Sequence, residues 1–325
     1  MNPILRFVIF VFTIGFAFAA PTANSYLVEG PLPQPRIFGE GIISGGDHDS
    51  HPAFSPDGQT LYFVRMAPDF SKWTIYFSRF KNGKWSEPEI APFSGQYWDA
   101  DPFFTKDGKT LYFISNRPIQ EGDPQKNDMD IWKIEKGKDG WSKPIRMEPP
   151  INSDSSEYYP TVADNGTMYF GSRRKGGRGA CDIYRSRMVE GQYRTTENAG
   201  DSINTAGNEF EPFVAPDESF LIFMASPSEY LEETDLYVSR NFQGRWTKAV
   251  KLPEPFNSPA TEFSPKLSPD GNYFFFSSNR NKQDGKFSRP ETTSEMNERI
   301  RQAGNGLLDI YQVDFSALQK ELKND

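Results

Sequence analysis

One short sequence pattern recurs five times along this chain of 325 residues. Each copy has an acidic residue, two further residues and a proline, followed by an Asp-Gly-like turn and a run of apolar, mostly aromatic residues. A long, nearly constant period indicates a repeat fold, because each copy forms one unit that packs against its neighbours. The prolines that mark the five copies are Pro52, Pro102, Pro160, Pro212 and Pro265.

Each copy contains segments with the features of four β-strands. In the second copy these are residues 102–105, 110–115, 130–134 and 145–147, and Asp107-Gly108 between the first two favours a tight hairpin. Aromatic residues make up 15% of the chain and concentrate in these segments, which is typical of strands. Four-stranded units repeated around an axis build a β-propeller. We therefore predict an all-β propeller of four-stranded blades, with five blades favoured and six as the alternative.

The fifth copy lacks a fourth strand, because only residues 312–325 follow its third strand-like segment. An apolar stretch near the N-terminus, residues 39–44, precedes the first copy much as the fourth strands precede the later ones. We predict that this N-terminal strand completes the last blade and closes the ring. Closure removes the exposed sheet edges that would otherwise favour aggregation.

The first residues differ from the rest of the chain. Arg6 is the only charged residue before Glu29, residues 7–20 are almost entirely apolar, and Ala17-Phe18-Ala19 provides a small-x-small cleavage site. These are the features of a secretory signal peptide. We therefore expect a periplasmic or extracellular protein with no transmembrane segment in its mature form. The predicted division is a signal peptide at 1–19, a linker at 20–38, the propeller at 39–315 and a C-terminal tail at 316–325.

Composition narrows the choice of partners. The formal charge is -8 and the sequence has no long basic stretch, so a nucleic-acid partner is not expected. Cys181 is the single cysteine, which leaves no pair for an intramolecular disulfide. No cofactor is indicated. A protein or peptide partner is expected, with carbohydrate as a further candidate.

Three phrases in the repeats resemble a known repeat family. They are FSPDG at residues 54–58, YFISNR at 112–117 and FSSNR at 276–280, and they are similar to the PD40 repeat, the WD40-like repeat of TolB-type propellers. The resemblance extends from about Asp49 to Tyr311. It implies a β-propeller that acts as a periplasmic interaction scaffold.

If the proline-led strand is innermost, the repeated acids lie together at the mouth of the axial channel. The loops between the second and third strands open on the same face, and several of them begin with an arginine. A charged funnel of this kind could capture a cation, a basic peptide or a sugar. The candidate ligand-binding residues are Asp49, Asp99, Glu157, Glu209, Glu262, His48, His51, Arg117, Arg174 and Arg280.

A second interpretation assigns the repeated acids to the wall of the propeller. A feature present in every blade is more often structural than catalytic, and we favour this interpretation. His48 and His51 could bind a metal only with a third ligand such as Asp101 or Glu211, and no metal site is predicted. No nucleophile-elbow motif is present. The alternative enzyme hypothesis is a glycoside hydrolase that uses two of the carboxylates Asp49, Asp101, Glu157 and Glu211.

The differences between the copies carry more information about function than their consensus. They are the histidines near residue 50, the basic loop at 173–179 and a long insertion in the fifth copy, where residues 293–303 are predicted to form a helix capped by Ser294. Tyr97-Trp98 and Tyr158-Tyr159 lie beside the acids and could stack on a sugar or a peptide. The sequence thus favours a non-enzymatic binding or scaffold propeller with no catalytic residues.

Overall fold

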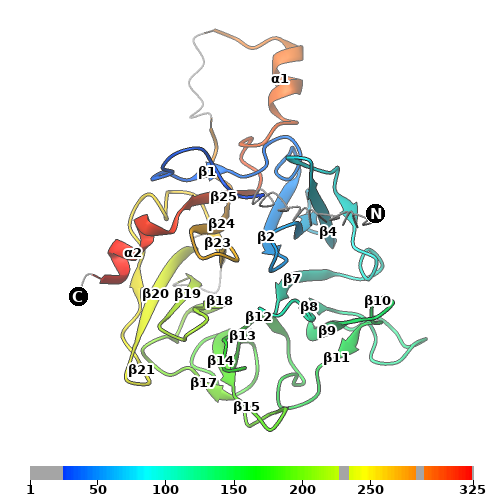
Figure 1. The fold of residues 1–325 in the computed structure, drawn as a ribbon, viewed down its shortest axis with the longest axis vertical. Coiled ribbons are helices and arrows are strands. Elements are labelled where there is room, and N and C mark those ends of the chain that lie inside the picture. Colours follow the sequence, from blue (N-terminus) through cyan, green and yellow to red (C-terminus); the bar gives the residue numbers. More distant parts are fainter. Residues whose placement is uncertain (1–24, 227–233, 283–288, 324–325) are drawn as a thin grey trace, which may run out of the picture.

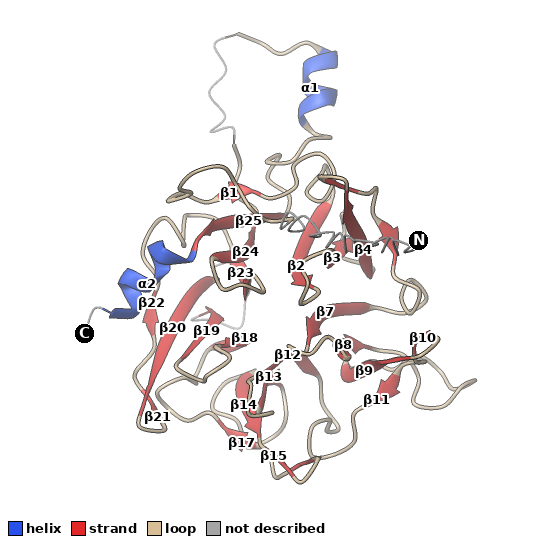
Figure 2. Cartoon of the chain, in the orientation of Figure 1, coloured by secondary structure: helices blue, strands red, loops and turns tan. Residues whose placement is uncertain are grey.

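Five four-stranded blades surround a central axis and form a five-bladed β-propeller (Figure 1). The computed structural model describes residues 25–226, 234–282 and 289–323, and the predicted signal peptide lies outside them. The strands of each blade are antiparallel, and the chain passes from the outer strand of one blade to the inner strand of the next. The inner strands β2, β7, β12, β18 and β23 surround the axis, and strands dominate the whole body (Figure 2). This confirms the all-β fold and the number of blades.

The outer strand of most blades is interrupted, so that two short strands both pair with the third long one. Blade 1 comprises β2 (His48–Phe54), β3 (Thr60–Met66), β4 (Trp73–Lys81), β5 (Lys84–Trp85) and β6 (Glu89–Ile90). Blade 2 comprises β7 (Asp99–Phe104), β8 (Thr110–Ser115), β9 (Asp130–Gly137), β10 (Gly140–Trp141) and β11 (Ile145–Arg146).

The third and fourth blades follow the same plan. Blade 3 comprises β12 (Glu157–Val162), β13 (Met168–Ser172), β14 (Asp182–Ser186) and β17 (Glu197–Asn198), with the small hairpin β15 (Met188–Val189) and β16 (Gln192–Tyr193) before the last strand. Blade 4 comprises β18 (Asn208–Val214), β19 (Phe220–Ser226), β20 (Asp235–Phe242), β21 (Arg245–Trp246) and β22 (Val250–Lys251).

Blade 5 combines an N-terminal strand with three strands from the C-terminal part of the chain. Its strands from the C-terminal part are β23 (Glu262–Leu267), β24 (Tyr273–Ser278) and β25 (Asp309–Asp314), and its outer strand is β1 (Arg36–Ile37). An N-terminal strand therefore closes the ring, as predicted, but it lies earlier than residues 39–44. Those residues form a turn instead, in which the N–H groups of Ile42 and Ile43 bond to Gly39 O. The closing strand falls inside the segment predicted to be a linker.

Two helices lie in the part of the chain that forms blade 5. Helix α1 (Thr293–Arg299) lies in the long insertion and projects away from the ring (Figure 1). Its N-cap is Thr292, in a capping box with Glu295, rather than the predicted Ser294. Helix α2 (Phe315–Lys323) follows β25 and occupies most of the predicted tail. No helix in the described part of the chain has the length and apolar character needed to cross a membrane.

The core consists of layers of aromatic side chains between successive blades. One position in the second strand of every blade holds a phenylalanine whose exposed fraction is 0% or 1%, so each sheet presents a large ring to its neighbour. The five rings belong to Phe63, Phe113, Phe170, Phe223 and Phe276. The periodic aromatic run of the sequence is thus the packing surface between blades.

The strand β1 gives a direct test of ring closure. Ile37 pairs with Tyr311 and is 5% exposed, whereas its counterpart in blade 1, Ile90, pairs with Tyr76 and is 49% exposed. We expect Ile37→Ala to lower the free energy of unfolding by about 2–5 kcal/mol because it opens a cavity at the seam. Ile90→Ala should change it by less than about 0.5 kcal/mol. Urea denaturation measures both, and equal effects would contradict a closure that depends on β1.

Candidate functional site

The five repeated acids are buried at the start of the inner strands, on what we call the loop face. This face carries the loops between the second and third strands. The opposite face, the hairpin face, carries the hairpins between the first and second strands. The acids Asp49, Asp99, Glu157, Glu209 and Glu262 have exposed fractions of 0% or 1%. Burial raises the pKa of Asp49, Glu157 and Glu209, although each carboxylate also accepts hydrogen bonds that act in the opposite direction.

Four of these acids accept a backbone N–H from the residue four positions earlier. The donors are Gly45, Ser153, Thr205 and Ser258, at 3.0, 3.1, 3.0 and 3.0 Å respectively. Asp99 instead accepts the hydroxyl of Ser94 at 2.8 Å. Each acid therefore binds the segment that connects the preceding blade to its own.

The predicted arginines complete the same contacts. Arg117 donates to Asp99 at 2.7 Å and to Phe93 O at 3.0 Å, and its guanidinium lies 5.0 Å from the centre of the Phe113 ring. Arg174 bonds Glu157 and the carbonyl of Ile151, and Arg280 bonds Glu262 and the carbonyl of Phe256. In blade 1, Arg65 takes this place and donates to Asp49 at 2.7 Å. The structure thus places the predicted acids and arginines inside the wall, and ligand binding by them stays a prediction.

The two histidines have different surroundings. His48 accepts the N–H of Leu308 at Nδ1, and its ring lies 4.5 Å from that of Phe70, so it belongs to the seam between blades 1 and 5. His51 points to the axis instead, where its Nε2 lies 3.1 Å from both Asp101 and Glu211. In the described residues, no group of three or more His, Cys, Asp or Glu side chains is arranged to hold a metal ion. The N–H groups of Arg178 and Gly179 in the basic loop bond Asp182.

His51 belongs to a set of equivalent residues, some of which sequence reasoning named one by one but not as a set. The residue before each proline sits in a β-bulge of its inner strand, with a left-handed backbone, φ between 47° and 56°. Such a conformation costs a non-glycine residue about 1–3 kcal/mol. These residues are His51, Asp101, Tyr159, Glu211 and Ser264. With the buried Lys266, they form what we call the axial cluster.

Contacts within the axial cluster link all five blades. His51 of blade 1 contacts Asp101 of blade 2 and Glu211 of blade 4. Asp101 accepts the N–H of Tyr159 at 2.8 Å, and Glu211 accepts the N–H of Ser264 at 2.6 Å. The N–H of His51 donates to Ser277 of blade 5 at 3.2 Å. The centre of the ring is therefore closed by polar side chains.

Two aromatic rings contact Lys266, the second basic residue of the axial cluster. The Nζ atom of Lys266 lies 4.0 Å from the centre of the Tyr159 ring and 4.8 Å from that of Phe103. The hydroxyl of Tyr159 donates to Pro265 O at 2.9 Å. The cluster combines two basic groups, His51 and Lys266, with two carboxyl groups, so that its charges balance when all four are ionised.

Burial and neighbouring charges shift the pKa values of the cluster. Burial alone would lower the pKa of His51, but the carboxylates of Glu211 and Asp101 outweigh it and raise that pKa above 6.5. Burial raises the pKa of Asp101 to about 6 despite the nearby His51. Burial lowers the pKa of Lys266 to about 7, although Asp101 and Glu211 oppose the shift. The cluster can therefore exchange protons near neutral pH.

One sequence signal could have revealed the axial cluster. Within the repeated acid-x-x-proline phrase, the residue before the proline is different in all five copies, while the acid and the proline recur. The enzyme alternative named Asp101 and Glu211 together with Asp49 and Glu157. Only the first pair reaches the axis, because only these two acids occupy bulge positions.

The wall contacts can be tested at Arg117, which is 8% exposed and pairs with the fully buried Asp99. We expect Arg117→Ala to lower the free energy of unfolding by about 3–5 kcal/mol, because it leaves a buried carboxylate without its counter-charge. The matched control is Arg194→Ala, which removes an exposed pair with Glu190 at 3.5 Å and should cost less than about 1 kcal/mol. Similar losses in thermal or urea denaturation would argue against a structural role for Arg117.

The two histidines should titrate on opposite sides of pH 6.5, which NMR of their ring signals can measure. We expect a raised pKa for His51, because of its two carboxylates, and a lowered pKa for His48, because of burial. The stabilisation from protonated His51 is complete below pH 6.5 and is lost as the pH rises through its raised pKa. In the His48→Gln variant the one ring signal that is left belongs to His51, which assigns both signals. A lower pKa for His51 than for His48 would refute this description of the axis.

No protein-family model matches the sequence, and no curated protein matches it. Among solved structures, the chain is similar to a protein assigned as TolB from Agrobacterium tumefaciens, with 16% identity, coverage of 83% of this chain and 91% of the other, and a TM-score of 0.47. It is similar to an α-L-arabinofuranosidase from Lactobacillus brevis, with 13% identity, coverage of 84% and 92%, and a TM-score of 0.48. It is also similar to a periplasmic gluconolactonase from Pseudomonas aeruginosa, with 15% identity, coverage of 71% and 66%, and a TM-score of 0.42. These likenesses concern the fold, and membership of the PD40 repeat family stays a prediction.

Proposed function

We propose that this chain is a secreted or periplasmic propeller that binds a protein, a peptide or a small ligand on its loop face and catalyses no reaction. The closed axial cluster is the observation that carries this proposal. Its carboxylates contact a histidine or accept backbone N–H groups, and His51, Asp101 and Lys266 are only 5–7% exposed. Carboxylates that are already bonded to other residues of the same protein are better suited to hold the fold rigid than to take part in a reaction.

The repeated acids support the same proposal. Each one accepts hydrogen bonds from its own wall and holds a crossing segment, as a scaffold requires. The loop face also presents aromatic surface beside this frame. Trp98 is 37% exposed and lies 5.6 Å from the ring of Trp73, and Phe70 is 49% exposed beside His48. Partly exposed aromatic rings on a rigid support are the side chains that most often anchor a protein or sugar ligand.

One observation favours the alternative, a glycoside hydrolase-like enzyme. Asp101 and Glu211 both contact the same nitrogen of His51, and the pKa of Asp101 is raised to about 6. Glycosidases need two carboxyl groups with different pKa values, one of them raised so that it can act as a general acid. In this alternative, Asp101 would be the acid and Glu211 the second carboxylate.

An activity assay separates the two hypotheses. We expect no hydrolysis of a panel of chromogenic aryl glycosides by the full chain between pH 5 and 8. We also expect a Trp98→Ala variant to lose at least tenfold in affinity for a peptide or oligosaccharide selected on immobilised wild-type protein, while Trp246→Phe, far from that surface, retains it. Hydrolysis that disappears in Glu211→Gln would overturn the proposal and establish the enzyme alternative.

A further inference from the structure

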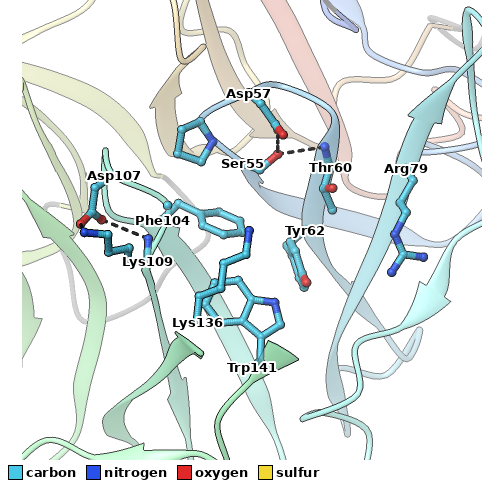
Figure 3. A pocket seen from close by; sticks show the side chains of 12 residues that line it. Ser55, Asp57, Thr60, Tyr62, Arg79, Phe104, Asp107, Lys109, Lys136 and Trp141 are labelled. Atoms are coloured by element: carbon cyan, nitrogen blue, oxygen red, sulfur yellow. Dashed lines mark hydrogen bonds and ion pairs between the residues drawn. The ribbon is translucent and has the colours of Figure 1, made fainter. Parts of the chain in front are cut away.

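A cavity of about 370 Å³ opens on the hairpin face between blades 1 and 2. The aromatic rings of Tyr62, Phe104 and Trp141 line it, and the cationic side chains of Arg79 and Lys136 stand beside them (Figure 3). Tyr62 contributes from the second strand of blade 1, whereas Phe104 and Trp141 come from the inner strand and an outer strand of blade 2. We call this space the 1–2 groove.

The equivalent groove between blades 5 and 1 is filled by the N-terminal segment of the chain itself. The repeat places Phe275, Phe54 and Trp85 there at the positions of Tyr62, Phe104 and Trp141. Phe38 packs edge-on against all three, with ring centres 5.3, 5.7 and 6.0 Å away. An aromatic side chain is therefore the natural occupant of this kind of groove.

Tyr26 fills the same groove closer to the hairpin face. Its ring lies 5.4 Å from that of Phe54, it is 3% exposed, and it covers Gly58 so closely that a Cβ atom there would come within 2.8 Å of the ring. The backbone of this segment is bonded to the blades as well. Asp314 accepts the N–H of Leu32 at 2.7 Å and donates its own N–H to Leu32 O at 2.8 Å. The chain thus shows how an extended peptide binds between two blades.

The 1–2 groove has the same walls, but its counterpart of Phe38 is much smaller. Phe38 and Ala91 follow equivalent outer strands and make equivalent bonds, from Phe38 N to Ile310 O and from Ala91 N to Ile75 O. Ala91 therefore supplies a methyl group where blade 5 supplies a ring. Side chains also join other blades: α2 packs Phe315 on Phe220 beside a second cavity of about 600 Å³, and Tyr169 bonds Glu218 between blades 3 and 4.

One position carries opposite charges in the two grooves. Arg79 stands at the position of Asp314, so a guanidinium that donates hydrogen bonds replaces a carboxylate that accepts one. Lys136 adds a second cation. The nearby carboxylates are already engaged in their own hairpins, where Asp57 accepts the N–H of Gln59 and Asp107 accepts that of Lys109. A ligand that suits this groove carries an aromatic ring together with an anionic group.

We propose that the 1–2 groove binds an aromatic side chain from an extended, acidic peptide segment of a partner protein. The ring lies among Tyr62, Phe104 and Trp141, and a neighbouring carboxylate pairs with Arg79 and Lys136. This groove lies on the face opposite to the proposed recognition surface, so the two proposals can succeed or fail separately.

The test uses the full chain and the blocked peptide acetyl-Glu-Ser-Tyr-Leu-Val-Glu-amide, which repeats residues 25–29 of the segment that fills the equivalent groove, with one added glutamate. We expect saturable binding by calorimetry at millimolar peptide, with a shift of the Trp141 indole N–H signal. Replacing the tyrosine of the peptide by alanine, or both of its glutamates by glutamine, should weaken binding at least tenfold. Added salt should weaken it as well.

Variants of the protein locate the site. Arg79→Glu and Lys136→Glu should each weaken binding at least tenfold. The control is Arg187→Glu. Arg187 is the counterpart of Arg79 in blade 3, its side chain is 60% exposed, and it lies far from the groove, so this variant should leave affinity unchanged. Lys136 is exposed, so its substitution keeps the test valid if Arg79→Glu unfolds. Absence of binding, equal binding of the alanine peptide, unchanged binding by the Lys136 variant, or a preference for glucuronic acid over the peptide would each overturn the proposal.

Discussion

Every blade depends on one buried carboxylate at the start of its inner strand. A carboxylate in such a place is strongly unfavourable unless it receives hydrogen bonds and a counter-charge. The crossing segment from the previous blade supplies those bonds, most often through the N–H four residues earlier, and an arginine supplies the charge in four blades. The geometry of each crossing therefore follows from the need to satisfy one acid. Because this need recurs five times, so does the crossing, and the ring closes.

The same phrase places a second, variable residue at the axis. The bulge before each proline gives all five residues the same left-handed backbone, yet their side chains are chemically different. Two acids, a histidine, a tyrosine and a serine then complement one another around the centre. The repeat fixes where these side chains point, while their differences, together with Lys266, allow a neutral and bonded centre in place of five equal charges in close contact.

Pseudo-symmetry also makes the grooves between blades comparable. The N-terminal segment fills the groove between blades 5 and 1, and α2 covers that between blades 4 and 5. The groove between blades 1 and 2 keeps its aromatic walls, with cations at its edge and a cavity within. Function in such a fold can therefore arise from a cavity between two blades as much as from an added motif.

Much of this fold could be predicted from the sequence. The period, the hairpin turns and the aromatic runs depend on local chemistry, so they establish the strands, the blades and their number without any knowledge of distant contacts. The predicted closing strand lies a few residues too late, because residues 36–37 and 39–44 are both short and apolar in part. Only the pairing of Ile37 with Tyr311 distinguishes them.

The site was less accessible to such reasoning. Sequence alone identified the repeated acids and favoured a place for them in the wall, and it named His51, Asp101 and Glu211, but it could not reveal that these three gather with Lys266 at the axis. That arrangement depends on a bulge, which reverses the direction of one side chain relative to its neighbours, and on contacts between residues up to 226 positions apart. The sequence by itself determined the repeating unit, because strands and turns are encoded locally. Only the tertiary structure decided which side chains meet at the axis and which line the cavity between blades 1 and 2, because both depend on how the five units pack.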